Sequence, residues 1–297
     1  MHFINKSIIS GNINCFISQI LWSLTFISLE FLWNEWDELS LMLMRFLVSC
    51  IFLLFIWISL EDFRKIFESN WLKGIYIGGI AWGIGGILLI FGQRYSDPIS
   101  TVLVLAMMPI AGMLIDTIYE KLKLTKNVVI GLILSLIGGY IATDVDYEEF
   151  KFKFGIIFCI LSIFLFAWGT RETVILKEFS TIGRTTVTLY GGLIIVLICY
   201  FLSLILNPDF HRTGSLNISQ LFILFIYTFP SAGLAQLFWI KGSEKLGVMF
   251  STFHMNALPF YVMFFMIIFN LGDRSWRKFL GIIIVFTGIT YSQLRRV

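Results

Sequence analysis

Residues 246–291 have the sequence LGVMFSTFHMNALPFYVMFFMIIFNLGDRSWRKFLGIIIVFTGITY, which consists of two apolar runs joined by a polar turn at residues 272–274. Asn256 and Pro259 interrupt the first run. Six residues in or just before this stretch have counterparts 150 positions earlier, and only one pair differs in residue type. The pairs are Gly242 and Gly92, Pro259 and Pro109, Met263 and Met113, Ser275 and Thr125, Gly281 and Gly131, and Gly288 and Gly138. A common offset of this kind indicates a duplicated chain.

The composition is that of a membrane protein. The chain has 297 residues, of which 58% are hydrophobic and only 14% are charged, a balance that a soluble domain does not have. The four cysteines fall in apolar segments, where they cannot build a disulfide framework or a paired-cysteine metal site. The net charge of +3 is spread between the apolar segments and therefore does not predict nucleic-acid binding.

Apolar segments of about 20 residues, the length that crosses a bilayer core, predict the membrane topology. We place ten spans at residues 12–32, 40–60, 71–93, 98–119, 125–143, 154–175, 185–206, 218–240, 248–270 and 275–293. The first run lacks a small-residue cleavage site, so we expect it to remain as a span. The predicted fold class is an all-α integral membrane protein with ten transmembrane helices.

The orientation follows from the lysines and arginines between the spans. With a cytoplasmic N-terminus, the segments predicted inside carry about twice as many of these residues as the segments predicted outside. Both termini are therefore predicted to be cytoplasmic, in a bacterial cytoplasmic membrane. Because five spans per half is an odd number, the second half must be inverted relative to the first. The two five-helix repeats are predicted at residues 1–150 and 151–297.

Several segments carry a family resemblance. They are residues 254–259 followed by 272–274 and Gly281, the parallel residues 107–109 followed by 120–122 and Gly131, and residues 21–23. Together with the five-plus-five arrangement, they resemble the drug/metabolite transporter superfamily, in particular its EamA-type branch. The resemblance implies a secondary transporter of amino acids, related metabolites or drugs. It also implies a central cavity lined by the first, third, fourth, sixth, eighth and ninth spans.

One departure from the family pattern concerns an acidic residue. The family often has Gly-Glu at the end of the fourth and ninth spans, whereas this chain has Tyr119-Glu120 in the first half and residues 272–273, Gly-Asp, in the second. No role for this acid is therefore carried over.

Pro109 and Pro259 are predicted to kink the fourth and ninth spans. Each proline removes a backbone hydrogen bond and frees a carbonyl group inside a membrane helix. Kinks at equivalent depth in the two halves suit the alternating-access mechanism, in which a transporter opens to each side of the membrane in turn. The alternative is that both prolines are tolerated in the membrane for packing alone.

Polar side chains inside the spans are the candidates for substrate binding, because an isolated charge in a membrane needs a partner or a wet cavity. The predicted substrate-binding residues are Trp22, Arg171, Glu172, Gln236, His254 and Asn256. Arg171 can fork onto a substrate carboxylate while Glu172 takes a cationic group, a division that suits a zwitterion. The alternative is that both side chains snorkel to the cytoplasmic interface.

Four further charged or titratable groups have two interpretations each. Asp116 and His254 are candidates for proton coupling, since Asp116 follows Pro109 on one face and an imidazole titrates near neutral pH. The alternatives are that Asp116 pairs with Lys121 or Lys123 and that His254 hydrogen-bonds a neighbouring helix. Glu30 is interpreted as solvated or paired with Arg45, and Arg45 as a side chain that snorkels outward.

No motif predicts a cofactor, a metal site or an enzyme; the glycines of residues 78–86 follow the close-packing pattern of membrane helices. The expected partners are a small-molecule substrate, the lipid bilayer, and a proton or counter-substrate, with no nucleic acid, in a monomer or homodimer. The preferred function is an exporter or exchanger of an amino acid or related zwitterion. The alternatives are a proton-coupled drug or cation exporter and, in another class, a non-transporting membrane receptor or scaffold.

Overall fold

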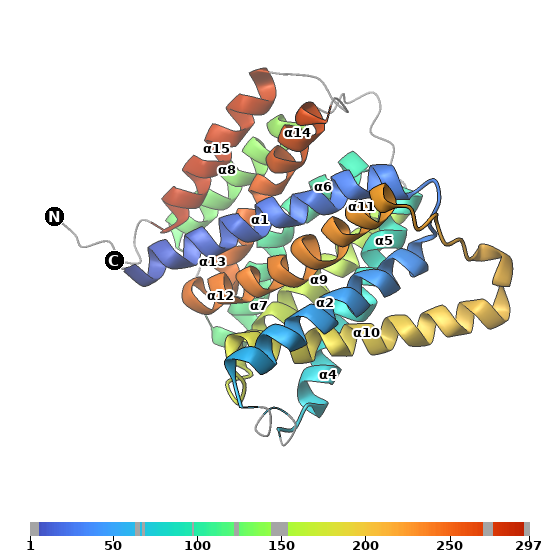
Figure 1. The fold of residues 1–297 in the computed structure, drawn as a ribbon. Helices are drawn as coiled ribbons and strands as arrows, with labels where there is room; N and C mark the ends of the chain where they lie inside the picture. Colours follow the sequence, from blue (N-terminus) through green and yellow to red (C-terminus); the bar gives the residue numbers. More distant parts are fainter. Residues whose placement is uncertain are drawn as a thin grey trace.

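A computed structural model of the chain describes residues 6–62, 66, 69–96, 98–121, 125–143, 154–269 and 276–293. Every regular element in these residues is a helix. The long helices lie alongside one another and form one bundle, with α8 and α15 together at one side of it (Figure 1). The fold class is therefore all-α, as predicted.

The first half of the chain consists of the following helices. They are α1 (Lys6–Leu32), α2 (Glu38–Leu60), α4 (Leu72–Gly78), the π-helical segment η1 (Gly79–Ile84), α5 (Gly85–Tyr95), α6 (Pro98–Ala106), α7 (Met108–Glu120) and α8 (Lys126–Thr143). Helices α4, η1 and α5 follow one another without a break and act as one long element.

The second half has a similar series. It consists of α9 (Gly155–Ile175), α10 (Thr181–Leu206), the short 3₁₀ turn η3 (Pro208–Phe210), α11 (Ile218–Thr228), the π-helical segment η4 (Phe229–Leu234), α12 (Ala235–Leu246), α13 (Val248–Thr252), the 3₁₀ segment η5 (Phe253–Ala257), α14 (Leu258–Ile268) and α15 (Trp276–Gln293).

Polar side chains begin several of these helices by accepting hydrogen bonds from free backbone N–H groups of the first turn. Asp37 precedes α2 and accepts from the Ser40 N–H at 2.9 Å. Ser180 precedes α10 and accepts from the Gly183 N–H at 3.1 Å, and Asn217 does the same for α11. The loop residues before these helices therefore fix where each apolar helix starts.

Within the described residues, seven helical stretches are long and apolar enough to cross a membrane, judged by length and composition alone. They are Lys6–Leu32, Glu38–Leu60, Leu72–Tyr95, Gly155–Ile175, Thr181–Leu206, Ile218–Leu246 and Val248–Ile268. These stretches coincide with the first, second, third and sixth to ninth predicted spans. The other three predicted spans fall on α6 with α7, on α8 and on α15. The number of ten spans stays a prediction.

Helix boundaries recur along the chain at the offset seen in the sequence. The π-helical segments η1 and η4 begin at Gly79 and Phe229, and α7 and α14 begin at Met108 and Leu258. In each of these pairs the two positions are 150 residues apart. A π-helical segment carries no simple sequence signal, so its repetition is an observation independent of the glycine and proline pattern.

The two predicted kink positions lie directly after helix interruptions. Pro109 is the second residue of α7, which follows a turn at Met107, and Pro259 is the second residue of α14, which follows the 3₁₀ segment η5. A proline has no N–H and collides with the preceding turn, so it is tolerated in the first turn of a helix. Both prolines therefore start a new helix inside an apolar stretch.

Glycines let two helix pairs approach closely, and the two contacts match. A Cβ atom added to Gly92 on α5 would lie 2.5 Å from Cys159 Sγ on α9. A Cβ atom added to Gly242 on α12 would lie 2.4 Å from Cys15 Sγ on α1. The structure thus packs α5 on α9 in the same way as it packs α12 on α1.

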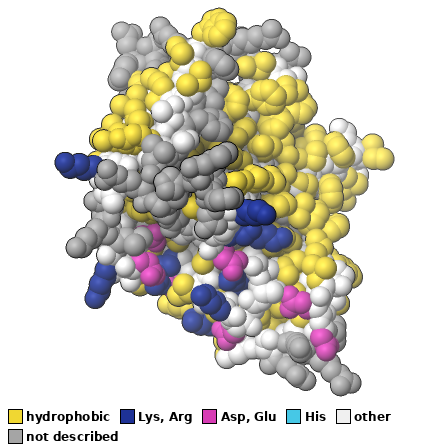
Figure 2. All heavy atoms as spheres, turned by 90° about the vertical axis from the view of Figure 1, so that its left-hand side faces the viewer, with side chains coloured by type: hydrophobic (Ala, Val, Ile, Leu, Met, Phe, Trp, Pro, Cys, Tyr) yellow, Lys and Arg dark blue, Asp and Glu magenta, His cyan; other side chains and the backbone are white. Residues whose placement is uncertain are grey.

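The charged side chains gather at the ends of the bundle. The first described residues of α1 and the last of α15 lie at the same end (Figure 1). Figure 2 shows that end, with Lys, Arg, Asp and Glu side chains on it and hydrophobic side chains over the adjoining flank. Exposed apolar residues such as Phe55, Ile205 and Leu206 cover the outer helices, as a lipid-facing surface requires.

Candidate functional site

A cavity of about 150 Å³ lies in the middle of the bundle. Its walls come from α1, α2, α5, α9 and α12, from the π-helical segments η1 and η4, and from the interrupted helices around Pro109 and Pro259. Both halves of the chain therefore contribute to it. Membrane transporters bind their ligands in this kind of place, where discontinuous helices meet near the centre of the bundle.

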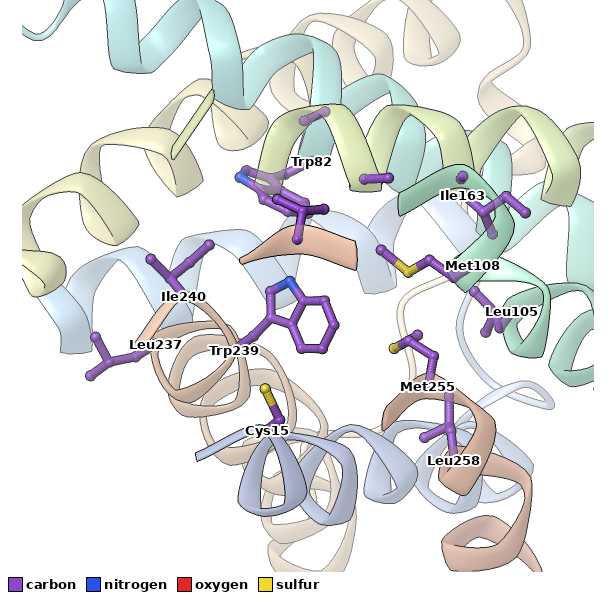
Figure 3. Packing of buried hydrophobic residues seen from close by; sticks show 14 of the residues in the cluster. Cys15, Trp82, Leu105, Met108, Ile163, Leu237, Trp239, Ile240, Met255 and Leu258 are labelled. Atoms are coloured by element: carbon purple, nitrogen blue, oxygen red, sulfur yellow. The ribbon is translucent and has the colours of Figure 1, made fainter. Parts of the chain in front are cut away.

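Aromatic rings form much of the wall. Trp22 on α1 and Trp239 on α12 pack with their ring centroids 5.2 Å apart. Trp82 on η1 stacks on Phe166 of α9 with the centroids 5.7 Å apart. Figure 3 shows Trp82 and Trp239 facing the same region as the side chains of Met108 and Met255, which also line the cavity.

Arg45 on α2 is the charged residue among the described residues that line this cavity. Its Nη1 donates to Thr25 Oγ1 at 3.0 Å, and its Nη2 donates to the Ser231 carbonyl oxygen of η4 at 3.2 Å. The guanidinium also lies 5.2 Å from the centre of the Tyr227 ring. These partners are all neutral, and they hold the guanidinium at the cavity wall instead of at the bilayer interface.

Three amide or indole nitrogens in the same wall lack a hydrogen-bond acceptor. They are Gln93 Nε2, Gln236 Nε2 and Trp82 Nε1, each on a side chain that is at most 8% exposed. A buried donor without an acceptor is costly unless a ligand or water fills the space. The cavity wall thus has several donors without an acceptor among the described residues.

The six predicted binding residues do not all line the cavity. Trp22 and Gln236 line the cavity, and their role in substrate binding stays a prediction. Arg171 and Glu172 do not line it. Arg171 Nη2 and Nη1 instead form ion pairs with Glu120 Oε1 at 2.7 Å and Glu172 Oε1 at 2.6 Å. These contacts lie at the end of the bundle where α7 and α9 end, and a role in substrate binding stays a prediction.

His254 and Asn256 are fully buried in η5, beside the residues that line the cavity. The imidazole of His254 lies edge-on to the Phe16 ring with the centroids 4.7 Å apart, and its Nδ1 is 3.2 Å from the Ser251 carbonyl oxygen. Neither amide atom of Asn256 has a partner. Met255, between these two residues, is the side chain of η5 that lines the cavity.

Asp116 joins the two halves of the chain. Its Oδ2 accepts a hydrogen bond from the Met249 N–H at 2.8 Å, in the first turn of α13, and the side chain is 4% exposed. Lys121 ends α7, whereas Lys123, the other predicted partner of Asp116, lies outside the described residues. The structural role of Asp116 is therefore to cap α13, and proton coupling stays a prediction.

Glu30 was interpreted as solvated or paired with Arg45, and the structure agrees with the first interpretation. Glu30 is exposed near the end of α1, and no ion pair joins it to Arg45 in the described part of the chain. Gln93 was not predicted at all. The signal that could have found Arg45 and Gln93 is their position, since each is a strongly polar side chain within or at the end of an apolar span.

Comparison with known proteins connects part of the chain to one family. Residues 9–143 match the EamA-like transporter family. This part of the chain is similar to that family. The matched region begins in α1 and ends with the last residue of α8, so it covers the first of the two similar helix series. None of the curated proteins compared with the chain matches it.

The fold extends over the whole chain. A chain described as "Crystal structure of protein" shares 14% sequence identity with this protein, covers 96% of each of the two chains and has a TM-score of 0.78. At that identity the match shows a common fold alone. The match over residues 9–143 supports a membrane transporter of the drug/metabolite type.

Proposed function

We propose that this protein is an EamA-type secondary transporter that exports or exchanges a small polar metabolite, an amino acid or related zwitterion, through the central cavity. The cavity between the two halves carries the proposal, because it combines one cationic side chain, several buried donors and an aromatic wall. A polar ligand that leaves water needs its hydrogen bonds replaced by fixed groups of this kind. The aromatic wall accommodates the apolar part of the ligand.

The proposed architecture is ten spans in two inverted repeats, residues 1–150 and 151–297. The recurring boundaries of η1 with η4 and of α7 with α14 support it. So do the matching contacts of Gly92 with Cys159 and of Gly242 with Cys15. Inverted repeats place equivalent broken helices on opposite sides of one site, which is the geometry that alternating access uses.

Contacts at one end of the bundle support a state in which that end is closed. Trp239 Nε1 donates to Thr170 Oγ1 at 2.9 Å, which ties α12 to α9 on this side of the cavity. Ser243 Oγ donates to Ser251 Oγ at 2.9 Å, and the Asp116 cap holds α13 against α7. By the positive-inside rule, this end is the proposed cytoplasmic side.

The location and partners belong to the same proposal. Both termini lie on the cytoplasmic side of a bacterial cytoplasmic membrane, and a proton or a counter-substrate drives the exchange in a monomer or homodimer. The alternatives fit the cavity less well. A drug or cation exporter needs an acid at its binding site, and Arg45 is the charge that the described lining residues supply. A receptor or scaffold function does not explain a cavity between the two halves that has a buried arginine in its wall.

Purified protein in proteoliposomes tests the proposal. Vesicles preloaded with labelled amino acids should release label faster than protein-free vesicles, and an imposed proton gradient or an external amino acid should change the rate. The Trp22→Ala variant should release label more slowly at matched protein content, because it removes part of the cavity wall. Release equal to that of protein-free vesicles for every amino acid, with or without a gradient, would contradict the function.

A further inference from the structure

We propose that Arg45 anchors the carboxylate of the transported ligand and that the cavity requires this carboxylate but no ammonium group. The inference rests on the proposed transport function and names the chemistry of its substrate: a small monocarboxylate with an apolar body. It assigns the anchoring role to Arg45 instead of Arg171.

The charge of Arg45 is the first step of the argument. Three other arginines of the described helices, Arg94, Arg171 and Arg184, each form an ion pair with a glutamate. Arg45 differs, because no carboxylate contacts it in the part of the chain that the structure describes, and its hydrogen bonds go to Thr25 and Ser231. A cation inside a membrane protein without a counter-ion marks a place where an anion binds.

The π-helical segment η4 holds Arg45 in place. The Ser231 carbonyl oxygen accepts from Arg45 Nη2 at 3.2 Å and from Thr25 Oγ1 at 3.4 Å. π-Helical segments inside α-helices occur frequently at functional sites, because they alter the backbone bonding of one turn. A guanidinium has five N–H donors, and hydrogen bonds to Thr25, Ser231 and Tyr227 do not use all of them, so N–H groups remain for a ligand carboxylate.

A second residue that lines the cavity is the independent second step. Trp82 belongs to η1, the counterpart of η4, and its Nε1 is buried without an acceptor. An indole N–H can only donate, and so can a guanidinium, so neither group can be satisfied by a ligand that offers donors alone. A ligand whose polar group is an ammonium would leave both donors unpaired. A carboxylate has two acceptor oxygens and can satisfy them.

The size and walls of the cavity define the rest of the ligand. Its volume is about 150 Å³, and a cavity of roughly this volume in another protein holds benzene. Phe26, Leu29, Met42 and Leu105 line it as apolar side chains, whereas no aspartate or glutamate does among the described residues. The site therefore accommodates an apolar group of the size of a branched amino-acid side chain. Its described residues provide no counter-ion for an ammonium group.

Leucine and two relatives that each lack one of its polar groups test the inference on the full chain in lipid nanodiscs. The relatives are 4-methylpentanoate, which lacks the amine, and 3-methylbutylamine, which lacks the carboxylate. We expect 4-methylpentanoate to bind at least as tightly as leucine, and 3-methylbutylamine at least about tenfold more weakly, since charge-assisted hydrogen bonds are lost. Tightest binding by the amine, or no binding by either carboxylate, would overturn the inference.

Variants test whether the Arg45 side chain itself, and not the overall positive charge of the protein, binds the carboxylate. Arg45→Gln should weaken both carboxylates at least about tenfold, whereas the matched variant Arg171→Gln, outside the cavity, should bind them as the wild type does. If Arg45→Gln does not fold, Arg45→Lys keeps the charge without the fork. It should bind carboxylates more weakly than the wild type yet still prefer them to the amine. Unchanged carboxylate binding in Arg45→Gln, or in Arg45→Lys, overturns the inference.

The two proposals fail in different ways. If wild-type vesicles transport amino acids but Arg45→Gln vesicles transport them at the same rate, the function stands and the anchoring role of Arg45 is wrong. If wild-type vesicles transport no amino acid, and neither 4-methylpentanoate nor 3-methylbutylamine, the transport function itself is wrong.

Discussion

Adding one methyl group at Gly242 or at Gly92 tests whether the two halves pack in equivalent ways. At Gly242, a Cβ atom would lie 2.4 Å from Cys15 Sγ and 3.0 Å from the Gly11 carbonyl oxygen. At Gly92, it would lie 2.5 Å from Cys159 Sγ and 3.0 Å from the Gly155 carbonyl oxygen. Comfortable contacts between carbon atoms are about 3.5–4.0 Å, so the paired helices must separate.

The expected cost follows from these distances. Overpacking of a tight core costs about 1–3 kcal/mol, and the higher helix propensity of alanine returns up to about 1 kcal/mol. We therefore expect Gly242→Ala and Gly92→Ala each to lower the free energy of unfolding by about 1–2 kcal/mol, and by similar amounts. Cys15→Ala should partly rescue Gly242→Ala, because it removes the sulfur atom but leaves the backbone contact.

Equilibrium unfolding of the purified protein in detergent micelles measures the effect. Gly233→Ala is the matched control, because the nearest atoms to its added Cβ are the side chains of Phe229 and Ser49 at 3.3 Å, which can adjust. Its unfolding free energy should change little. A large loss in one variant of the pair with none in the other would refute the equivalence of the two contacts, and with it a main support for the repeat.

Three further predictions concern the closed end and the topology. Asp116→Ala should lower the unfolding free energy by about 1 kcal/mol through the loss of the α13 cap, and an unchanged denaturation midpoint would contradict this role. Trp239→Phe keeps the ring but removes the bond to Thr170, and should also cost about 1 kcal/mol in the same assay. In a cysteine-free background, Glu178→Cys and Ser215→Cys, at the two ends of α10, should react with an impermeant thiol reagent from opposite sides of the membrane; labelling from one side would contradict the topology.

The sequence by itself determined the features that depend on composition and on the local backbone. A bilayer selects apolar helical segments whatever their neighbours are, so hydropathy predicted the membrane class. Local motifs such as residues 107–109 and 21–23 carried the family resemblance, which the match of residues 9–143 supports. Proline limits the backbone of its own turn, so Pro109 and Pro259 predicted interruptions that the structure places directly before them.

Only the tertiary structure decided which polar side chains share the cavity. The rotation of each helix about its axis depends on contacts with distant residues, such as that of Gly242 with Cys15, and hydropathy does not report it. Arg45 and Arg171 are similar in sequence terms, since each is an arginine within an apolar helix. Packing turns Arg45 toward the cavity, where η4 holds it, and sets Arg171 between Glu120 and Glu172, because each charge lies where its neighbours or a ligand can balance it.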